Sequence, residues 1–298
     1  MAKPDVNALP TYLEQNVDQL IAKSVLGANT LDYISTQTGI KTSASINLLN
    51  TDVEFGDGST CGFEDRGNQS ITQRVIETGQ IKVNMSYCEK NLLGKYTEKL
   101  VKIGATEADM PLGEYFTEDV IKAIKAAMEK AIWQGDKESG DANLNKFDGF
   151  LKIMANDENV NKLGPLENDS AYSKIKTLYE RIPVKILDEA VIFVGAEEYR
   201  SFIGELVEKN LYHYSPEKGE NELYFPGSTV RVIKVNGLNQ TGKMVACRPD
   251  HLFYGTDLES NTEVFDFFYS RDNREFRLVV EWNAGVNYAF SDEITLVG

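Results

Sequence analysis

A long amphipathic segment, residues 117–135, restricts what this chain can fold into. Apolar residues recur there at the three- and four-residue spacing of one helix face, which predicts a helix roughly 27 Å long. Thr117 is a suitable N-cap, and Gly135 is a natural residue just after a helix end. The apolar positions are Val120, Ile121, Ile124, Ala127, Met128, Ala131 and Ile132. The residues assigned to or near the opposite, polar side are Lys122, Lys125, Glu129 and Lys130.

The chain that follows this helix is a polar turn and then an apolar stretch. The turn covers residues 135–140, and the chain becomes apolar again at Phe147. Residues 150–154 are expected to form a short strand. This local pattern alone also fits an ordinary helix packed on a core, so the rest of the chain must decide its meaning.

Composition predicts a folded protein without a membrane span. The 298 residues are 42% hydrophobic, enough for one large or two modest domains. No run of about 18 apolar residues occurs, and no secretory signal is expected. The net charge of −15 argues against tight binding to nucleic acid or anionic lipid. Three widely spaced cysteines, Cys61, Cys88 and Cys247, fit free thiols in a reducing cytoplasm.

The first part of the chain has too few apolar residues to build a core of its own. Residues 1–50 combine a short amphipathic helix, ended at Gly27, with a segment rich in Ser, Thr, Asn and Gln. We expect this arm to lie along its own subunit or a neighbour. Residues 51–74 are rich in glycine and predict a long, mobile hairpin. Alternating apolar residues across 70–88, with a turn at Thr78-Gly79, predict a half-buried antiparallel ribbon.

The second half of the chain divides into a mixed α/β unit and an all-β tail. Residues 164–245 alternate helical and strand patterns, and the apolar run 190–194 predicts a central buried strand. Residues 244–298 predict successive strands parted by turns. The other elements expected in the α/β unit are helices near 172–182 and 199–207 and a strand at 229–235. The strands expected in the tail are 244–247, 252–254, 264–269, 276–282 and 286–290.

No residue pattern in the chain indicates an active site. The two histidines, His213 and His251, are assigned to turns, because the strand and turn near His251 do not direct it toward Cys247. Metal-binding Cys-x-x-Cys and His-Glu-x-x-His patterns and a phosphate-binding loop do not occur. The acidic residues 136–141 lack the Gly and Glu that a calcium loop needs later in its sequence. We therefore predict no catalytic, cofactor-binding or metal-binding residues.

Three segments, taken in chain order, carry a resemblance to a known family. The first is Trp133-Gln134-Gly135-Asp136 at the helix end, followed by Phe147-Asp148-Gly149-Phe150-Leu151. The second is the run 191–194 leading into 199–203, with Phe225-Pro226-Gly227 after it. The third is the ending 276–286. In this order they resemble the spine helix with its Gly-Asp loop and the Gly-hydrophobic strand after it, the A domain and the last P-domain strands of the major capsid proteins of tailed double-stranded-DNA bacteriophages. Encapsulin shells share that fold.

The resemblance implies an α+β fold with an N-terminal arm, an extended E-loop hairpin, a P domain with a spine helix and a β-sheet, and an inserted α/β A domain. The implied boundaries are 1–50 for the arm, 51–74 for the E-loop, 75–163 and 246–298 for the P domain, about 117–134 for the spine helix, and 164–245 for the A domain. It also implies a structural protein, not an enzyme, that self-assembles as hexamers and pentamers into an icosahedral shell around the phage DNA. Such a protein is found in the virion and is assembled in the bacterial cytoplasm.

Two departures from the family pattern bear on the expected partners. Some members carry a long N-terminal scaffolding domain, and residues 1–50 are too few for it, so a separate scaffolding protein or loss of that domain is expected. Some members join subunits by a Lys–Asn bond from the E-loop, but residues 51–74 contain no lysine. We expect non-covalent cohesion or added cement proteins. A portal protein is a further expected partner, the enclosed DNA is not bound by sequence, and no membrane partner is expected.

Two other functions remain open from the sequence. An encapsulin-like compartment would use the same fold to enclose a cargo enzyme. A cytosolic enzyme would use the α/β unit as a nucleotide pocket, and the missing phosphate-binding loop argues against it.

Overall fold

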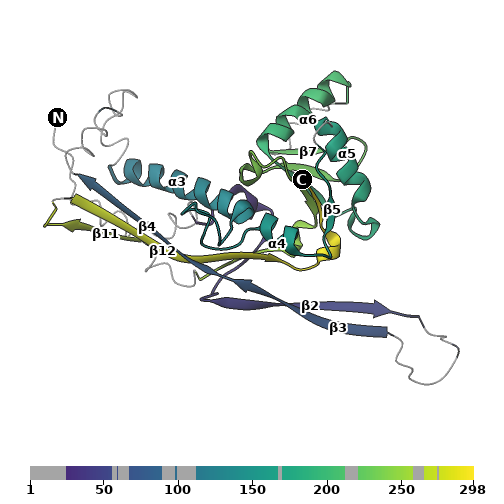
Figure 1. The fold of residues 1–298 in the computed structure, drawn as a ribbon, viewed down its shortest axis with the longest axis horizontal. Coiled ribbons are helices and arrows are strands. Elements are labelled where there is room, and N and C mark those ends of the chain that lie inside the picture. Colours follow the sequence, from purple (N-terminus) through teal and green to yellow (C-terminus); the bar gives the residue numbers. More distant parts are fainter. Residues whose placement is uncertain are drawn as a thin grey trace.

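The structure, a computed structural model, arranges the chain around three sheets (Figure 1). A five-stranded sheet lies along a long helix, a six-stranded sheet forms a lobe with two helices, and a two-stranded hairpin extends away from both. The residues that the structure describes are 25–55, 59, 67–88, 98, 112–166, 170–211, 221–257, 265–273 and 275–298.

The five-stranded sheet has the order β1-β10-β12-β11, and β4 pairs with the other side of β12. Among its described strands, β1 and β10 form a parallel pair, and the other pairs are antiparallel. Its strands are β1 (Ser35–Gln37), β4 (Gly79–Cys88), β10 (Leu252–Thr256), β11 (Phe265–Ser270) and β12 (Glu275–Tyr288). The strand β12 is the axis of this sheet, because its 14 residues pair with three other strands.

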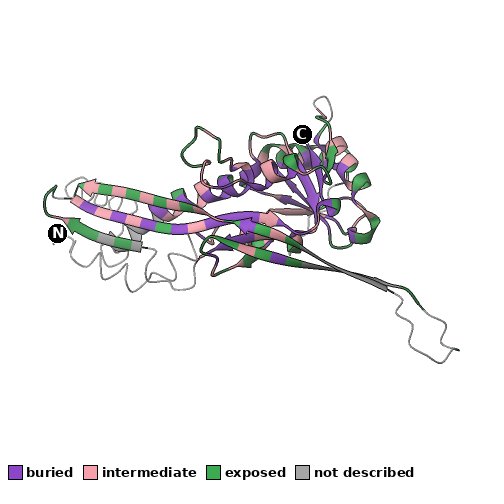
Figure 2. Cartoon of the chain, turned by 60° about the horizontal axis from the view of Figure 1, so that its bottom comes forward, coloured by how far each residue is buried: buried purple, intermediate pink, exposed green. Residues whose placement is uncertain are grey.

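The long helix α3 (Leu112–Gln134) lies along this sheet. Buried and partly exposed residues alternate along β12 from Phe276 to Val280, as expected for a strand with one face on a core (Figure 2). Residues of α3 at helical spacing, Val120, Ile124 and Met128, belong to the same buried cluster. The period-2 pattern of the sheet and the 3.6-residue pattern of the helix therefore meet in one core.

The six-stranded sheet has the order β5-β13-β9-β6-β8-β7. Its central strand β6 is wholly buried, as its uninterrupted apolar sequence requires. Its strands are β5 (Asn161–Leu163), β6 (Val191–Val194), β7 (Glu222–Tyr224), β8 (Arg231–Lys234), β9 (Met244–Cys247) and β13 (Thr295–Val297). The helices α5 (Ala171–Arg181) and α6 (Ala196–Glu208) contribute to a second buried cluster with this sheet. The chain ends in this lobe, because β13 pairs between β5 and β9.

The hairpin consists of β2 (Ser43–Val53) and β3 (Gly67–Glu77). Their antiparallel register runs from Ser43 opposite Glu77 to Val53 opposite Gly67. Among the described residues the two strands pair only with each other. The remaining elements among the described residues are the helix α4 (Phe150–Asn156) and the 3-10 turns η1 (Asn29–Asp32), η2 (Val184–Ile186), η3 (Asn236–Leu238), η4 (Pro249–His251) and η5 (Ser291–Glu293).

The expected elements of the α/β unit are confirmed as α5, β6, α6 and β8. The expected long helix is also present, but it begins at Leu112, so Thr117 is an interior residue and not the N-cap. The apolar spacing Leu112, Phe116, Val120 continues the helical period upstream of Thr117, so the helix begins before the capping residues that its apolar centre indicates. No described helix combines the length and apolar character that a bilayer span requires.

The prediction of a strand at residues 150–154 is wrong, because this segment lies in the helix α4. Phe150, Leu151 and Met154 are buried at i, i+1 and i+4, which is one helix face. A short apolar run cannot be assigned to strand or helix from periodicity alone. Gly149 precedes the helix in an extended conformation and accepts a hydrogen bond from Ile153 N at 3.1 Å.

The ribbon expected across 70–88 contains both predicted strands but has the wrong pairing. β3 pairs with β2, and β4 pairs with β12, so the chain changes sheets at Thr78. The strands expected at 276–282 and 286–290 are in fact one strand, β12. Gly285 continues this strand, and a Cβ there would lie 2.1 Å from Glu77 O, so glycine serves a close backbone approach instead of a turn.

Gly135 follows α3, as expected, without the left-handed conformation typical of a C′ glycine. A Cβ at Gly135 would lie 2.5 Å from Phe147 O and 2.6 Å from Ala131 O. The glycine is therefore needed because the segment before α4 packs against the end of α3.

We predict that Gly237→Ala destabilises the fold, because its Cβ would lie 2.2 Å from Trp133 Cδ1 and 2.3 Å from Glu129 O. Overpacking of this kind typically lowers the free energy of unfolding by about 1–3 kcal/mol, measurable by urea titration. The control is Gly204→Ala in α6, where a Cβ meets nothing within 4 Å and alanine favours the helix. Equal stability of the two variants would contradict this packing.

Candidate assembly interface

A buried hydrogen-bond network fixes the segment before β1 to the spine helix α3. Thr30 N donates to Glu129 Oε2 at 3.0 Å, and the Thr30 hydroxyl donates to Glu129 Oε1 at 2.7 Å. The same hydroxyl accepts a hydrogen bond from Trp133 Nε1 at 2.7 Å. Gly237 N, from η3, completes the set with a 3.4 Å bond to Glu129 Oε1. Three segments far apart in sequence therefore meet at one carboxylate.

The structure corrects the assignment of Glu129 to the polar side of the helix. Its side chain is buried, four residues before Trp133 on the same helix face. Burial raises the pKa of Glu129, and the hydrogen bonds from Thr30 and Gly237 oppose that rise. With a raised pKa, any stability contributed by this group is fully present below its ordinary pKa and is lost as the pH rises through its folded value.

The arm is expected to lie on its own subunit or on a neighbour, and its described part lies on its own subunit. Val25, Ala28 and Ile34 belong to the buried cluster that contains α3 and β12. Ile40 packs with Ile46 and the base of the hairpin. Residues 1–24, including the amphipathic helix expected there, lie outside the described residues.

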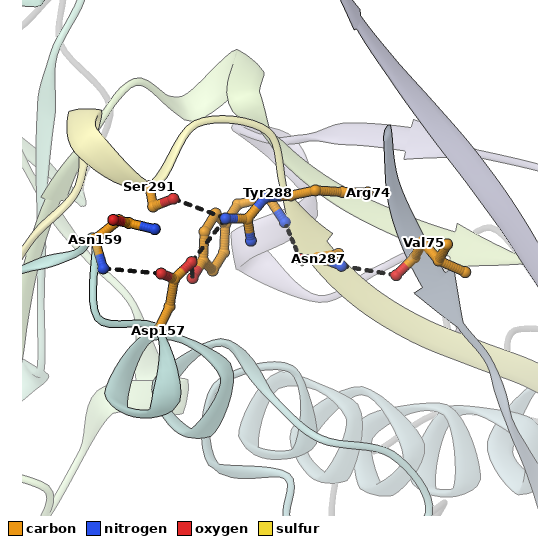
Figure 3. Close-up of polar contacts among 7 residues, drawn as sticks. All are labelled: Arg74, Val75, Asp157, Asn159, Asn287, Tyr288 and Ser291. Atoms are coloured by element: carbon orange, nitrogen blue, oxygen red, sulfur yellow. Dashed lines mark hydrogen bonds and ion pairs between the residues drawn. The ribbon is translucent and has the colours of Figure 1, made fainter. Parts of the chain in front are cut away.

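The base of the hairpin is held by Arg74 on β3 (Figure 3). Its Nη2 donates to Asp157 Oδ2 and to Ser291 Oγ, both at 2.7 Å. The guanidinium carbon lies 4.4 Å from the centroid of the Tyr288 ring, within the range of a cation–π contact. The Tyr288 hydroxyl donates to the same Asp157 oxygen at 2.9 Å. Arg74 thus connects the hairpin to the end of β12 and to the residue after α4.

The carboxylate of Asp157 is stabilised in its charged form. Burial opposes ionisation, but hydrogen bonds from Arg74, from Asn159 N at 3.0 Å and from Tyr288 lower its pKa to about 2. Beside it, Asn287 Nδ2 donates to Val75 O at 2.7 Å, which ties the hairpin backbone to β12 (Figure 3). These contacts set the direction in which the hairpin leaves the body.

Further contacts secure the turn from the hairpin into β4. Lys137 Nζ lies 2.8 Å from Glu77 Oε2, and the Thr78 hydroxyl donates to Thr42 O at 3.0 Å. Ile46 and Ile76 are buried there. At roughly 3.4 Å per residue, the stretch from Ile46 to Val53 spans roughly 24 Å. The hairpin therefore has a base held by several contacts, and its strands extend well beyond that base (Figure 1).

The histidines and cysteines considered for catalysis do not come together in an active site among the described residues. His251 Nδ1 lies 2.6 Å from Glu293 Oε2, and its ring packs on Phe290 with centroids 4.9 Å apart, so it is held between η4 and η5. Cys247 is buried in β9, where burial raises the pKa of its thiol. Cys88 is exposed and free. His213 and Cys61 lie outside the described residues.

In the acidic loop after α3, the carboxylate of Asp136 accepts hydrogen bonds from groups of the same chain. Asp136 Oδ1 accepts from Lys152 Nζ at 2.6 Å and from Glu138 N at 2.8 Å. Its pKa is lowered chiefly by the bond from Lys152. Across the described ranges, no group of His, Cys, Asp and Glu side chains has the arrangement of a metal site.

Sequence reasoning missed the two polar networks that position the arm and the hairpin. The spacing of Glu129 and Trp133 was a usable signal for the first, since residues four apart share a helix face. Arg74, Asp157 and Tyr288 have no such signal, because they belong to three separate elements that meet only in the folded chain.

Comparison with known proteins gives a match in structure and none in sequence. No protein-family model and no curated protein matches the chain. The satellite phage P4 procapsid, solved with its size determination (Sid) protein, has a TM-score of 0.61 at 10% identity, over 95% of this chain and 97% of that chain. The capsid of the empty GTA particle has a TM-score of 0.52 at 9% identity, over 91% and 89%.

The chain has the tailed-phage capsid fold. A virus-like particle from Pyrococcus furiosus has the same likeness, with a TM-score of 0.52 at 9% identity over 97% of this chain and 98% of that chain. Identities near this level show the fold alone. Within this capsid fold, α3 is the spine helix and β2–β3 is the projecting hairpin.

We predict that Thr30→Val loosens the arm from the spine helix. The substitution keeps the side-chain shape but removes the hydroxyl that bridges Trp133 and Glu129. The buried Trp133 Nε1 then loses its acceptor, and Glu129 Oε1 keeps only the 3.4 Å bond from Gly237 N. The expected loss is about 1–3 kcal/mol in the free energy of unfolding, measured by urea titration. Thr30→Ser retains the hydroxyl and should lose less. A larger loss for Ser than for Val would show that the methyl group, and not the network, matters.

We predict that Asp157 makes the fold sensitive to acid. Because its pKa is lowered to about 2, its contribution to stability is complete above its ordinary pKa of 3.8 and is lost as the pH falls toward 2. The contribution is about 2 kcal/mol. Between pH 4 and pH 2, Asp157→Asn should remove that part of the decline in unfolding free energy. Arg74→Met should reduce the same pH dependence, and the double variant should lose less than the sum of the two.

Proposed function

We propose that this chain is a major capsid subunit that self-assembles through its arm and hairpin into an icosahedral shell around a phage double-stranded DNA genome. The observation that carries the proposal is the hairpin β2–β3. It is fixed to the body at Arg74, yet among the described residues it has no strand partner beyond its own pair. Exposed strand edges favour pairing or packing with another chain, and identical copies supply such contacts by symmetry.

The energetic argument for a shell is additive. Each subunit in a closed assembly is held by several modest contacts at once, so the assembly is stable although no single contact is strong. Obligate assemblies of this kind bury about 2,000 Å² or more per interface. A hairpin reaching roughly 24 Å beyond its buried base supplies much of this area at little expense to the core of its own subunit.

The division of labour within the subunit follows from this proposal. We assign residues 1–50 to the arm, 51–74 to the E-loop, 75–163 with 246–298 to the P domain, and 164–245 to the A domain. Two features refine these boundaries. The hairpin pairing already begins at Ser43, and the β13 strand joins the sheet of the A domain.

The charge of the chain fits a container for DNA. A net charge of −15 repels a polyanion, so packaged DNA is confined without being bound by sequence. We further propose a virion location after assembly in the host cytoplasm, with a separate scaffolding protein, a portal protein and cement proteins as partners. Without a lysine in residues 51–74, cohesion between subunits is non-covalent.

A second candidate function is an encapsulin-like compartment that encloses a cargo enzyme. The likeness to the virus-like particle from Pyrococcus furiosus has the same TM-score as the likeness to the GTA capsid, so the fold alone does not separate this candidate from a viral capsid. Electron microscopy of particles, together with the ratio of absorbance at 260 and 280 nm, separates the two. Packaged DNA supports the viral capsid, and a protein cargo supports the compartment.

We predict that deleting residues 55–67 abolishes shell formation while the six-stranded lobe stays folded. The deletion joins Glu54 directly to Asn68. Asp52 and Asn68 can stay paired, with Val53 and Glu54 forming a tight turn between the strands. Negative-stain microscopy should show particles for the full chain and none for the deletion, with α/β structure retained in circular dichroism. Normal shells from the deletion would contradict the role of the hairpin. A full chain that stays monomeric would contradict the capsid proposal itself.

A further inference from the structure

Two neighbouring segments carry the chain between the five-stranded sheet and the six-stranded lobe. β9 of the lobe leads through η4 into β10 of the five-stranded sheet, and β12 of that sheet leads through η5 into β13 of the lobe. The two segments run antiparallel, because Leu252 pairs with Tyr288 at one end and Ala246 pairs with Thr295 at the other. They therefore form a narrow two-stranded connection between the sheets.

The strand pairing of this connection is interrupted at the junction, which we define as residues 247–251 and 289–294. In the described chain, no strand pair joins η4 to η5. The backbone contact between the two segments there is a hydrogen bond from Ala289 N to His251 O at 2.8 Å. Local opening is easiest where few buried contacts and backbone bonds hold a structure closed. Side-chain contacts across the junction therefore matter for keeping it closed.

A histidine and a glutamate make such a contact. His251 Nδ1, on η4, lies 2.6 Å from Glu293 Oε2, on η5. The Glu293 side chain is 9% exposed and that of His251 is 22% exposed, so water screens this pair less than a surface pair. The imidazole also packs on the ring of Phe290, which holds it in place. When the imidazole is protonated, the bond is charge-assisted and roughly twice as strong as a neutral one.

The charges around Glu293 leave one negative charge unbalanced when His251 is neutral. Lys185 Nζ, from η2, lies 3.4 Å from Glu293 Oε1 and 2.7 Å from Asp292 Oδ2. Cys247, at the end of β9, contributes no charge, because burial, and then Glu293, raise the pKa of its thiol. One lysine thus faces two carboxylates, and a protonated imidazole supplies the second positive charge.

The other charged groups on the adjoining elements do not supply that charge. Arg248 is paired with Glu189 at 2.6 Å, and Arg74 is paired with Asp157 at 2.7 Å. Two further charged side chains are exposed to water, which screens them: Asp250 of η4 and Lys162 of β5. The charge balance of the junction near neutral pH therefore depends on the protonation of one imidazole.

We propose that the His251–Glu293 contact is a proton-dependent link between the five-stranded sheet and the six-stranded lobe. A histidine side chain gains its positive charge as the pH falls from about 8 to about 5. With His251 charged, the two turns are held together most strongly. As the pH rises through that range the charge is lost, and the junction opens more readily. This inference goes beyond the proposed function, because the link lies within one subunit and needs no contact between copies.

Hydrogen–deuterium exchange of the full chain tests the link at two backbone amides of the junction. Ala289 N donates across it, and Asn161 N donates to Ile294 O at 3.0 Å. After correction for the intrinsic effect of pH on exchange, their protection should be about fivefold lower at about pH 8 than at about pH 5.5, as a charge-assisted hydrogen bond becomes a neutral one. The control amide is Val235 N, which donates to Val194 O at 2.9 Å within the lobe and should not change.

Three variants separate the charge of the imidazole from its other contacts. His251→Asn retains a side-chain donor without a charge, so the two amides should show the low protection at both pH values. His251→Lys is charged at both pH values and should show the high protection at both. Glu293→Gln removes the acceptor charge and should also abolish the pH dependence. The matched control is His213→Asn, which replaces the other histidine of the chain and should behave as the unmodified protein.

Equal protection at the two pH values in the unmodified chain would overturn the inference. So would a pH dependence that persists in His251→Asn or one that disappears in His213→Asn. Urea titration of each variant shows whether it is folded. Because the variants alter the two partners separately, a variant that fails to fold leaves the others to decide. The exchange measurement gives the same result whether or not the chain forms shells, so failure of the proposed function and failure of this inference are distinguishable.

Discussion

The end of the spine helix, at Trp133, is where the separate parts of this subunit are joined. Its ring lies 5.4 Å from Phe150 on α4 and 5.3 Å from Phe193 on β6, and its Nε1 donates to Thr30. Gly237 approaches the same ring so closely that a side chain there would overlap it. One fully buried residue of the spine helix thus contacts the arm, α4 and the six-stranded lobe. Because these contacts are shared, the parts behave as one body from which the hairpin projects.

The hairpin is built on a different principle from the body. Its base combines a charged pair, a cation–π contact and buried isoleucines. The charged pair is hydrogen-bonded and therefore directional, so the base resists rotation better than an apolar contact alone would. Beyond that base, strand pairing is the main constraint the described chain provides. A two-stranded hairpin gains little stability by itself, and in the proposed shell a neighbouring copy covers it. The capsid fold accounts for this combination of a fixed base and a projecting pair of strands.

Much of the fold could be predicted from local patterns. The spine helix, the helices α5 and α6 and the strand β6 all have strong periodicity or continuous apolar sequence, and all were expected near their observed positions. The errors fall where the local signal is ambiguous. Residues 150–154 are too short to distinguish helix from strand, and Asn283-Ala284-Gly285 has the composition of a turn but continues β12. In both places, close packing against a distant backbone decides the outcome.

By itself, the sequence determined the strongly periodic helices and strands, most of their apolar faces, and the order of segments that resembles a capsid protein. Only the tertiary structure decided which strands pair, because β3 and β4 have equivalent alternating patterns yet join different sheets. It also decided that Glu129 is buried and that Arg74 holds the hairpin. The physical reason is range: periodicity reports on residues within a turn or two of helix or strand. Pairing, burial of charge and close backbone approach depend on residues outside that range, as between Thr30 and Glu129, which are 99 positions apart, or between Arg74 and Tyr288.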